Sequence, residues 1–141
     1  MSAASNFLED ELVKHIFRTG SFTKPTVLAV ALGTNATTDA TTGTWGDEVP
    51  NAGSYARVDR PPLDANWDAT SGTDGHTSNT AVITFPTATG SWGTISNFII
   101  ASSATWNAGN SYVHGALTAN KTVGSGDVFQ FAAGALDVTV A

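Results

Sequence analysis

The stretch SNFLEDELVKHIFRTG, residues 5–20, has the apolar spacing of an amphipathic helix. Asn6 and Glu9 have the spacing of a capping box, and Gly20 is placed to end the helix. Acidic side chains gather near its start and basic ones near its end, as the helix dipole favours. These signals agree and predict a helix over residues 5–20. The apolar residues that share one face of it are Leu8, Leu12, Val13, Ile16 and Phe17.

The apolar face of this helix has to be covered, because the helix stands ahead of a segment that is rich in strands. The face can pack on the protein's own sheet, as in most layered domains. It can also dock on a neighbouring subunit or on a larger particle, as helices do in apolar grooves. The first alternative is favoured and the second stays open. Candidate interface residues on the helix are Leu8, Leu12, Ile16 and Phe17.

The rest of the chain has the pattern of strands and turns. Residues 26–32, TVLAVAL, are apolar on both faces, which predicts a covered strand inside a sheet. Residues 79–85 alternate, with Ile83 and Phe85 on one face. Strands that follow one another without helices predict an antiparallel β-sandwich or a jelly-roll-like barrel. The other predicted strands are residues 54–59, 94–102, 112–118, 127–132 and 136–140.

The length of 141 residues fits a single domain, residues 1–141, with a sizeable core. The expected division is the helix followed by a mainly β body over residues 26–141. Two polar segments, residues 33–53 and 60–78, interrupt the strands as long loops. Loops of this length are uncommon in a compact domain unless they have a role.

The composition excludes several classes of partner and site. The net charge is −6 and the six basic residues are scattered, so nucleic acid and anionic membranes are not expected partners. The chain contains no cysteine, which rules out disulfides and thiolate chemistry. Its start does not resemble a secretory signal, and no apolar run is long enough for a membrane span. The expected setting is therefore a cytoplasm in which the protein is made and joins an assembly.

Charged residues make up only 13% of the chain, about half the usual share. Low charge suits a β protein whose sheet faces carry many hydroxyl groups. It also suits a subunit that is packed in an assembly, because charge is depleted at the centre of interfaces.

Candidate catalytic groups do not combine into a site. Asp64, Asp68 and His76 offer ligands for calcium, but their spacing is not that of an EF-hand and turn chemistry explains them equally well. Asp47 and Glu48 resemble a carboxylate pair, yet adjacent residues on an extended chain point apart. His15 and His114 are expected on the surface and half-buried, respectively. The sequence also has no nucleophile elbow and no phosphate loop, so no catalytic, cofactor or metal site is predicted.

Four tryptophans are expected in loops or at strand ends, and they are candidate interface residues. They can cover the open ends of a sandwich core, anchor a contact between subunits, or stack on sugars. The sequence leaves these alternatives open, with the core role favoured. The residues are Trp45, Trp67, Trp92 and Trp106.

Three segments resemble a family of small structural proteins of tailed bacteriophages. They are residues 5–34, residues 82–100 (VITFPTATGSWGTISNFII) and residues 114–141 (HGALTANKTVGSGDVFQFAAGALDVTVA). Members of this family are often labelled tail-fibre proteins, and some are similar to capsid cement, or decoration, proteins. The resemblance implies a component of the virion, assembled in the cytoplasm of the host bacterium, with no enzymatic activity.

The favoured expectation from the resemblance is a cement protein that stabilises the icosahedral shell. Such a protein would form a homotrimer and bind the major capsid protein. The alternative is a tail-tip or tail-fibre component that contacts the host surface.

Overall fold

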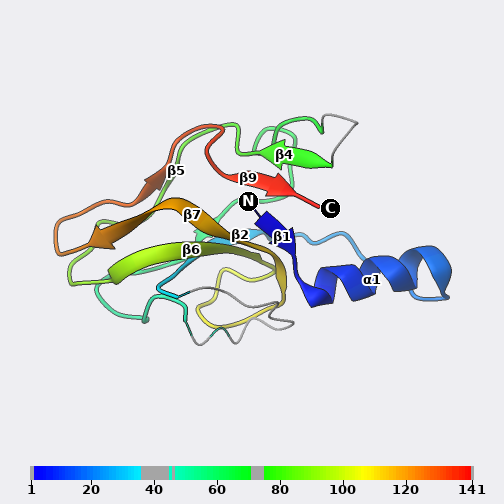
Figure 1. Ribbon diagram of the computed structural model, residues 1–141, viewed down its shortest axis with the longest axis horizontal. Helices are drawn as coiled ribbons and strands as arrows, with labels where there is room; N and C mark the ends of the chain where they lie inside the picture. The colour runs from blue at the N-terminus through cyan, green and yellow to red at the C-terminus, as the bar shows by residue number, and fades with distance from the viewer. Residues whose placement is uncertain (1, 36–44, 46, 71–74, 141) are drawn as a thin grey trace.

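The computed structural model describes residues 2–35, 45, 47–70 and 75–140. This part of the chain is mainly β with a helix near the N-terminus, as predicted. The helix projects from the body (Figure 1), so the favoured expectation that its apolar face packs on the protein's own sheet holds only for its first part. The helix α1 spans Asn6–Phe17. The strands are β1 (Ser2–Ala4), β2 (Ala29–Gly33), β3 (Val58–Asp59), β4 (His76–Ser78), β5 (Ile83–Thr84), β6 (Gly93–Ala101), β7 (Ser111–Val123), β8 (Gln130–Phe131) and β9 (Asp137–Thr139).

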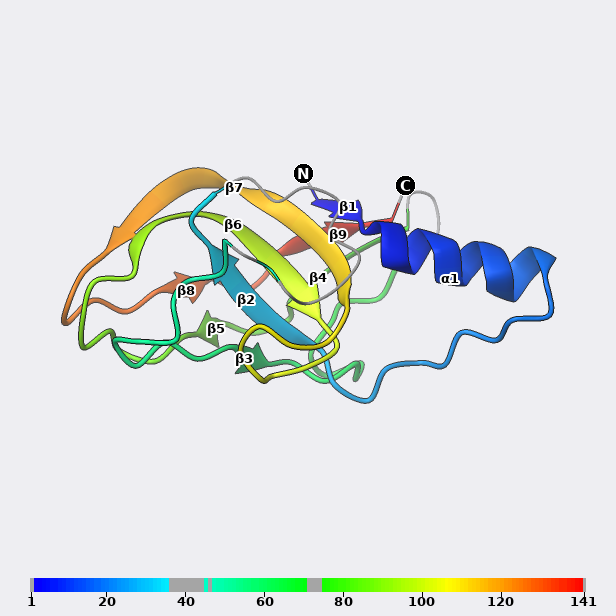
Figure 2. The ribbon, with the colours of Figure 1, turned by 90° about the horizontal axis from the view of Figure 1, so that it is seen from below.

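The main sheet is antiparallel, with the strand order β1-β7-β6-β2-β3. Two small antiparallel pairs, β4 with β9 and β5 with β8, lie on one side of it (Figure 2). The core fills the space between these layers, which makes the fold sandwich-like. The described strands form no closed barrel, so of the two predicted architectures the sandwich is confirmed.

The predicted covered strand is β2, whose residues are all buried. Strand β2 pairs with β6 along its whole length on one side, and with β3 at Ala29 and Val30 on the other. Apolar side chains on both faces are needed there because both faces are covered. Val30 and Leu32 belong to the main core, while Ala31 packs with Ile99 and Trp45 in a smaller cluster on the opposite face.

Aromatic rings join the two layers of the core. The ring of Phe85 lies 5.7 Å from that of Phe129 and 6.4 Å from that of Phe131, both nearly edge to face. The ring of Phe131 in turn lies 6.1 Å from that of Phe98 on β6. Edge-to-face contact is a favoured geometry for aromatic pairs, so these rings hold β5, β8 and the main sheet together.

Several predicted strands are shorter in the structure, and one is longer. Only Ile83–Thr84 of residues 79–85 pairs as a strand, because Asn79 is fully buried and holds a turn instead. Its side-chain amide donates to the carbonyls of Ala81 and Ala132, and its Oδ1 accepts from the amide of Leu136. Three other predicted strands are also shorter. Residues 54–59 pair only at Val58–Asp59, residues 127–132 only at Gln130–Phe131, and residues 136–140 only at Asp137–Thr139. The predicted strand 112–118 is part of the longer strand Ser111–Val123.

The helix is also shorter than predicted, and its cap is different. Ser5, not Asn6, is the N-cap, and its Oγ accepts a hydrogen bond from the amide of Leu8 at 3.2 Å. The helix ends before Gly20, because Arg18 is already extended, with its amide bonded to the carbonyl of Lys14. Of the predicted loop over residues 33–53, residues 36–44 and 46 lie outside the described part of the chain. Of the predicted loop over residues 60–78, residues 71–74 lie outside it, and His76–Ser78 is strand β4, which corrects the end of that loop.

Candidate functional site

The feature that stands out from the body is the arm, defined here as residues 6–28: helix α1 and the extended segment that returns to β2 (Figure 2). The arm is fixed at its base. β1 pairs with β7, and the amide of Ser5 donates to the carbonyl of Tyr112 at 2.9 Å. The Ser5 hydroxyl also donates to the carbonyl of Ser111. The first turn of the helix is therefore part of the main sheet's hydrogen-bond network.

Aromatic packing reinforces the base of the arm. The ring of Tyr112 lies 5.8 Å from that of Phe7, at the start of the helix, and 6.2 Å from that of Phe22, on the returning segment. Tyr112 thus contacts both halves of the arm. Burial between them raises the pKa of the Tyr112 phenol above its ordinary value. Leu8 completes this base and belongs to the main core.

The outer half of the helix does not pack on the body. Ile16 is 65% exposed and Phe17 is 78% exposed, and Val13 is also exposed. Only the first part of the predicted apolar face is covered, since Leu8 is buried and Leu12 is partly buried against the core. We define the arm tip as Val13, Ile16 and Phe17. It is an apolar patch on a rigid projection, and no described part of the chain covers it.

Two contacts hold the outer helix and the returning segment in place. The amide of Phe22 donates to Nδ1 of His15 at 3.1 Å, which gives His15 the surface position expected from the sequence. The Lys14 ammonium bonds the carboxylates of Asp10 and Glu11, and the hydrogen bond to Asp10 is the main reason that the pKa of Lys14 is raised. Of these contacts, only the bond between Phe22 and His15 links the helix to the returning segment, and neither contact covers the arm tip.

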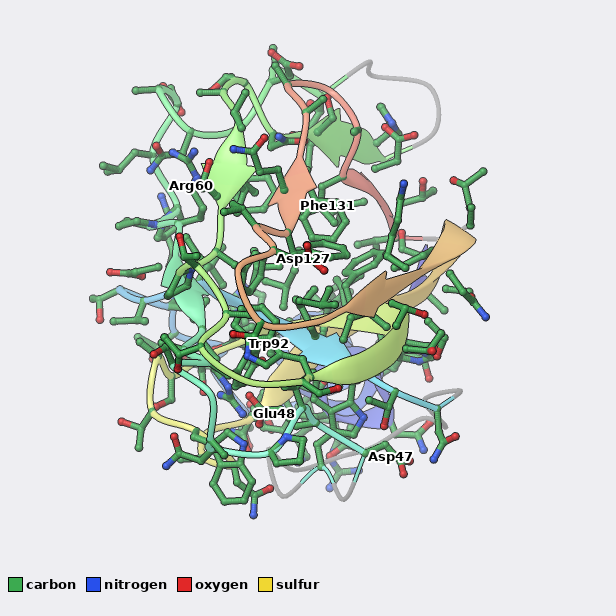
Figure 3. The ribbon with its side chains drawn as sticks, turned by 90° about the vertical axis from the view of Figure 1, so that its left-hand side faces the viewer. Asp47, Glu48, Arg60, Trp92, Asp127 and Phe131 are labelled. Atoms are coloured by element: carbon green, nitrogen blue, oxygen red, sulfur yellow. The ribbon has the colours of Figure 1, made fainter. Side chains whose placement is uncertain are left out.

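Beneath the arm lies an apolar groove of about 320 Å³, here called the arm groove. Its wall and floor are formed by Leu28, Leu63, Trp67, Tyr112 and Val138. Asp64, Asp68 and Lys24 lie at its edge. A second hollow, the end trough, has about 660 Å³ and lies between β7 and β8 at the opposite end of the body. Figure 3 looks toward that end, where Asp127 and Phe131 are among its lining residues.

The carboxylates that the sequence presents side by side are separated by the fold. Glu48 is 4% exposed and lies toward the interior, whereas Asp47 is nearer the surface (Figure 3) and accepts a hydrogen bond from Asn35. Glu48 forms a bidentate ion pair with Arg57, with both N–O distances at 2.7 Å. The Tyr55 hydroxyl also donates to Glu48, at 3.1 Å.

Arg57 also bonds to the backbone, so four of its five donors have partners. Its Nη1 donates to the carbonyls of Ser103 and Ala108, both at 2.8 Å, while the amide of Asn107 donates to Glu48. Burial raises the pKa of Tyr55 far above its ordinary value. This buried pair ties together the segments that carry Glu48, Ser103 and Ala108. Sequence reasoning missed it, since the only signal was two opposite charges nine positions apart, one in a predicted loop and one in a predicted strand.

The four tryptophans do not form one site. Trp92 is buried in the main core and its Nε1 donates to the carbonyl of Gly53, whereas Trp45 is buried in the smaller cluster. Trp67 is partly buried and lines the arm groove. Trp106 is 38% exposed, and its Nε1 donates to the carbonyl of Val49. Covering the core therefore describes Trp45 and Trp92 best. A role in subunit contacts stays a prediction for Trp67 and Trp106.

The remaining titratable candidates are used in local structure. His76 Nε2 lies 3.1 Å from Asp137 Oδ1, across the β4–β9 pair, and Asp68 accepts a hydrogen bond from Ser78. His114 is half-buried on β7, as expected. Within the described residues, no three histidine or carboxylate side chains gather closely enough to hold a metal ion. No helix in this part of the chain is long and apolar enough to span a membrane.

Comparison with known proteins identifies the family of the chain. A search of curated proteins found no similar one. A family model described as "Podophage GP4 fiber I protein gp80" matches residues 3–139, which is nearly the whole chain and includes the arm, the main sheet and both small strand pairs. The chain therefore belongs to this family of bacteriophage fibre proteins, and the resemblance to small structural proteins of tailed phages is confirmed.

Proposed function

We propose that this protein is a non-enzymatic subunit of the fibre apparatus of a tailed-phage virion, and that it joins the virion through its arm. The observation that carries the proposal is the arm tip: three large apolar side chains on a rigid helix with no cover from the described body. The family's description as a fibre protein supports the fibre over the capsid as the location.

The physical case for docking rests on the free energy of exposed apolar surface. Fully burying a side chain such as valine, isoleucine or phenylalanine stabilises by about 1.5–3 kcal/mol relative to leaving it exposed. The arm tip is half to three-quarters exposed, so the isolated subunit forgoes most of that stabilisation. A helix of this kind is used in proteins as an anchor for an apolar groove. Its anchored base supports the same conclusion, because a rigid element loses little conformational entropy on binding.

The state of the ionisable groups favours a structural role over a catalytic one. The deeply buried pair Glu48 and Arg57 is hydrogen-bonded internally and to Tyr55, Ser103, Asn107 and Ala108. Catalysis requires a nucleophile, a base and a binding site that converge. In the described residues, the arm groove is walled mainly by apolar side chains, with carboxylates only at its edge.

The test is incorporation into virions. The variant Phe17→Asp places a charge at the most exposed position of the arm tip, where it leaves the folded core untouched. Its matched control is Val82→Asp, at a position that is 47% exposed on the body. We expect at least about tenfold less Phe17→Asp protein in purified virions, measured by quantitative mass spectrometry, and unchanged incorporation of the control. Equal incorporation of both variants would show that the arm is not the attachment element.

A capsid cement protein, acting as a trimer on the major capsid protein, is the second candidate. The observation that favours it is the low share of charged residues, 13%, which suits a subunit with much of its surface packed against neighbours. Copy number separates the two candidates. A few copies per virion, located at the tail, support the fibre role, whereas hundreds of copies distributed over the shell support cement.

A further inference from the structure

We propose that the arm tip of one copy inserts into the arm groove of a second copy, so that the protein assembles with itself by arm exchange. This inference rests on the proposed docking role of the arm and names its first partner. Both halves of the contact, an apolar projection and an apolar recess, are present on the same chain.

The groove has room for apolar side chains. Its volume is about 320 Å³ and its lining is largely apolar. Leu63, on the groove wall, is 57% exposed, and Trp67 and Tyr112 are partly exposed beside it. Insertion of Phe17 would place its ring beside Leu63, Trp67 and Tyr112. Aromatic side chains contribute most to binding when they fill an apolar pocket of this kind.

The charges around the two surfaces are complementary. Arg18 directly follows the arm tip in the chain, and Asp64 and Asp68 line the groove and are exposed. Within the described residues, none of the ion pairs formed involves Arg18, Asp64 or Asp68. Lys24 also lines the groove, so Asp64, Asp68 and Lys24 together carry a net charge of −1. An acidic edge that meets a basic tip favours this orientation of the helix over the reverse.

The tip of the same chain does not fill the groove. The twelve residues of α1 make a helix about 18 Å long, at 1.5 Å per residue, and its base is bonded to β7. The tip is thus held away from Tyr112 and Val138, and Figure 2 shows the helix extending beyond the body. A second copy, approaching with its own projecting arm, would bring its tip to this groove.

The first experiment measures self-association of the purified chain by analytical ultracentrifugation over a wide concentration range. We expect a defined oligomer for the wild type. Phe17→Asp should weaken association at least about tenfold, whereas Val82→Asp should leave it unchanged. Circular dichroism and thermal unfolding of both variants confirm that they are folded. A wild-type protein that stays monomeric throughout the range would overturn the inference.

The second experiment locates the contact by disulfide cross-linking. The chain has no native cysteine, so only the introduced cysteines can react. Singly substituted proteins Phe17→Cys and Leu63→Cys are mixed and oxidised, so that a disulfide between the two species forms only between different copies. The control mixtures replace Leu63→Cys by Val82→Cys on the body or by Val128→Cys in the end trough. We expect the Phe17–Leu63 product to exceed both controls about tenfold. A preference for the Val128 mixture would place the tip in the end trough and refute the proposed pairing.

The two proposals fail in different ways. Wild-type protein that is present in virions at a fixed copy number, but forms no Phe17–Leu63 cross-link, refutes arm exchange and leaves the fibre role standing. Protein that cross-links as expected but is missing from purified virions refutes the fibre role and leaves arm exchange standing.

Discussion

Breaking the buried ion pair between Glu48 and Arg57 should destabilise the protein more than the loss of any surface ion pair. The two side chains are 0% and 1% exposed, and Arg57 donates four hydrogen bonds, two to Glu48 and two to backbone carbonyls. Glu48→Ala leaves the guanidinium charged, buried and without its carboxylate. Removing one partner of such a pair costs about 3–5 kcal/mol. For a chain of this length that lowers the melting temperature by roughly 10–15 °C.

The measurement is urea unfolding followed by tryptophan fluorescence, for Glu48→Ala, Arg57→Ala and the double variant. Each single variant leaves one buried charge without its partner. We therefore expect the double variant to lose about 1–3 kcal/mol less free energy of unfolding than the two single variants together. Added salt should not change the effect, since a buried pair is poorly screened. The matched control is Lys14→Ala, which breaks an exposed pair with Asp10 and Glu11 and should leave the unfolding midpoint nearly unchanged. Single variants that behave like this control, or strictly additive effects, would refute the reasoning.

Three further predictions concern stability. Asn79→Ala should cost about 1–3 kcal/mol in urea unfolding, because it removes three hydrogen bonds and leaves the buried amide of Leu136 without the acceptor that the Asn79 side chain supplies. Ser5→Ala should cost about 1–2 kcal/mol and reduce the helical circular dichroism signal, since it removes the cap of α1, and an unchanged signal would contradict that role. Because the pKa of Tyr55 is raised in the folded state, its contribution to stability is complete below about pH 10, the ordinary tyrosine pKa, and is lost as the pH rises above it. The urea midpoint should therefore fall between about pH 9 and 11 in the wild type and fall less in Tyr55→Phe.

The arm shows why an apolar helix face that is predicted from a sequence does not reveal what will pack against it. An isolated helix of about twelve residues is marginal in water, so α1 depends on its attachment at Ser5 and Tyr112. That attachment fixes the first turn and directs the remaining turns away from the body. The outer turns keep their helical conformation through local contacts, such as the bond between Phe22 and His15, while their apolar side chains stay exposed.

The sequence therefore predicted the arm helix of the candidate site but not the arm groove. The sequence identified the helix, the face on which Leu8 and Phe17 lie, and the possibility that this face docks on another molecule. It did not distinguish the inner residue from the outer one, because both have the same periodicity. It also gave no sign of the arm groove, whose wall combines Leu28, Trp67 and Val138 from three distant parts of the chain.

What the sequence by itself determined was the class of fold and the elements with strong local patterns: α1, β2 and β6. These follow from periodicity and composition, which act over a few neighbouring residues. The tertiary structure alone decided that Glu48 turns inward to Arg57, that Asn79 interrupts a strand-like segment, and that Phe17 is left exposed. The physical reason is that burial and charge pairing depend on which segments meet in space, and antiparallel sheets bring together residues that are far apart in the chain.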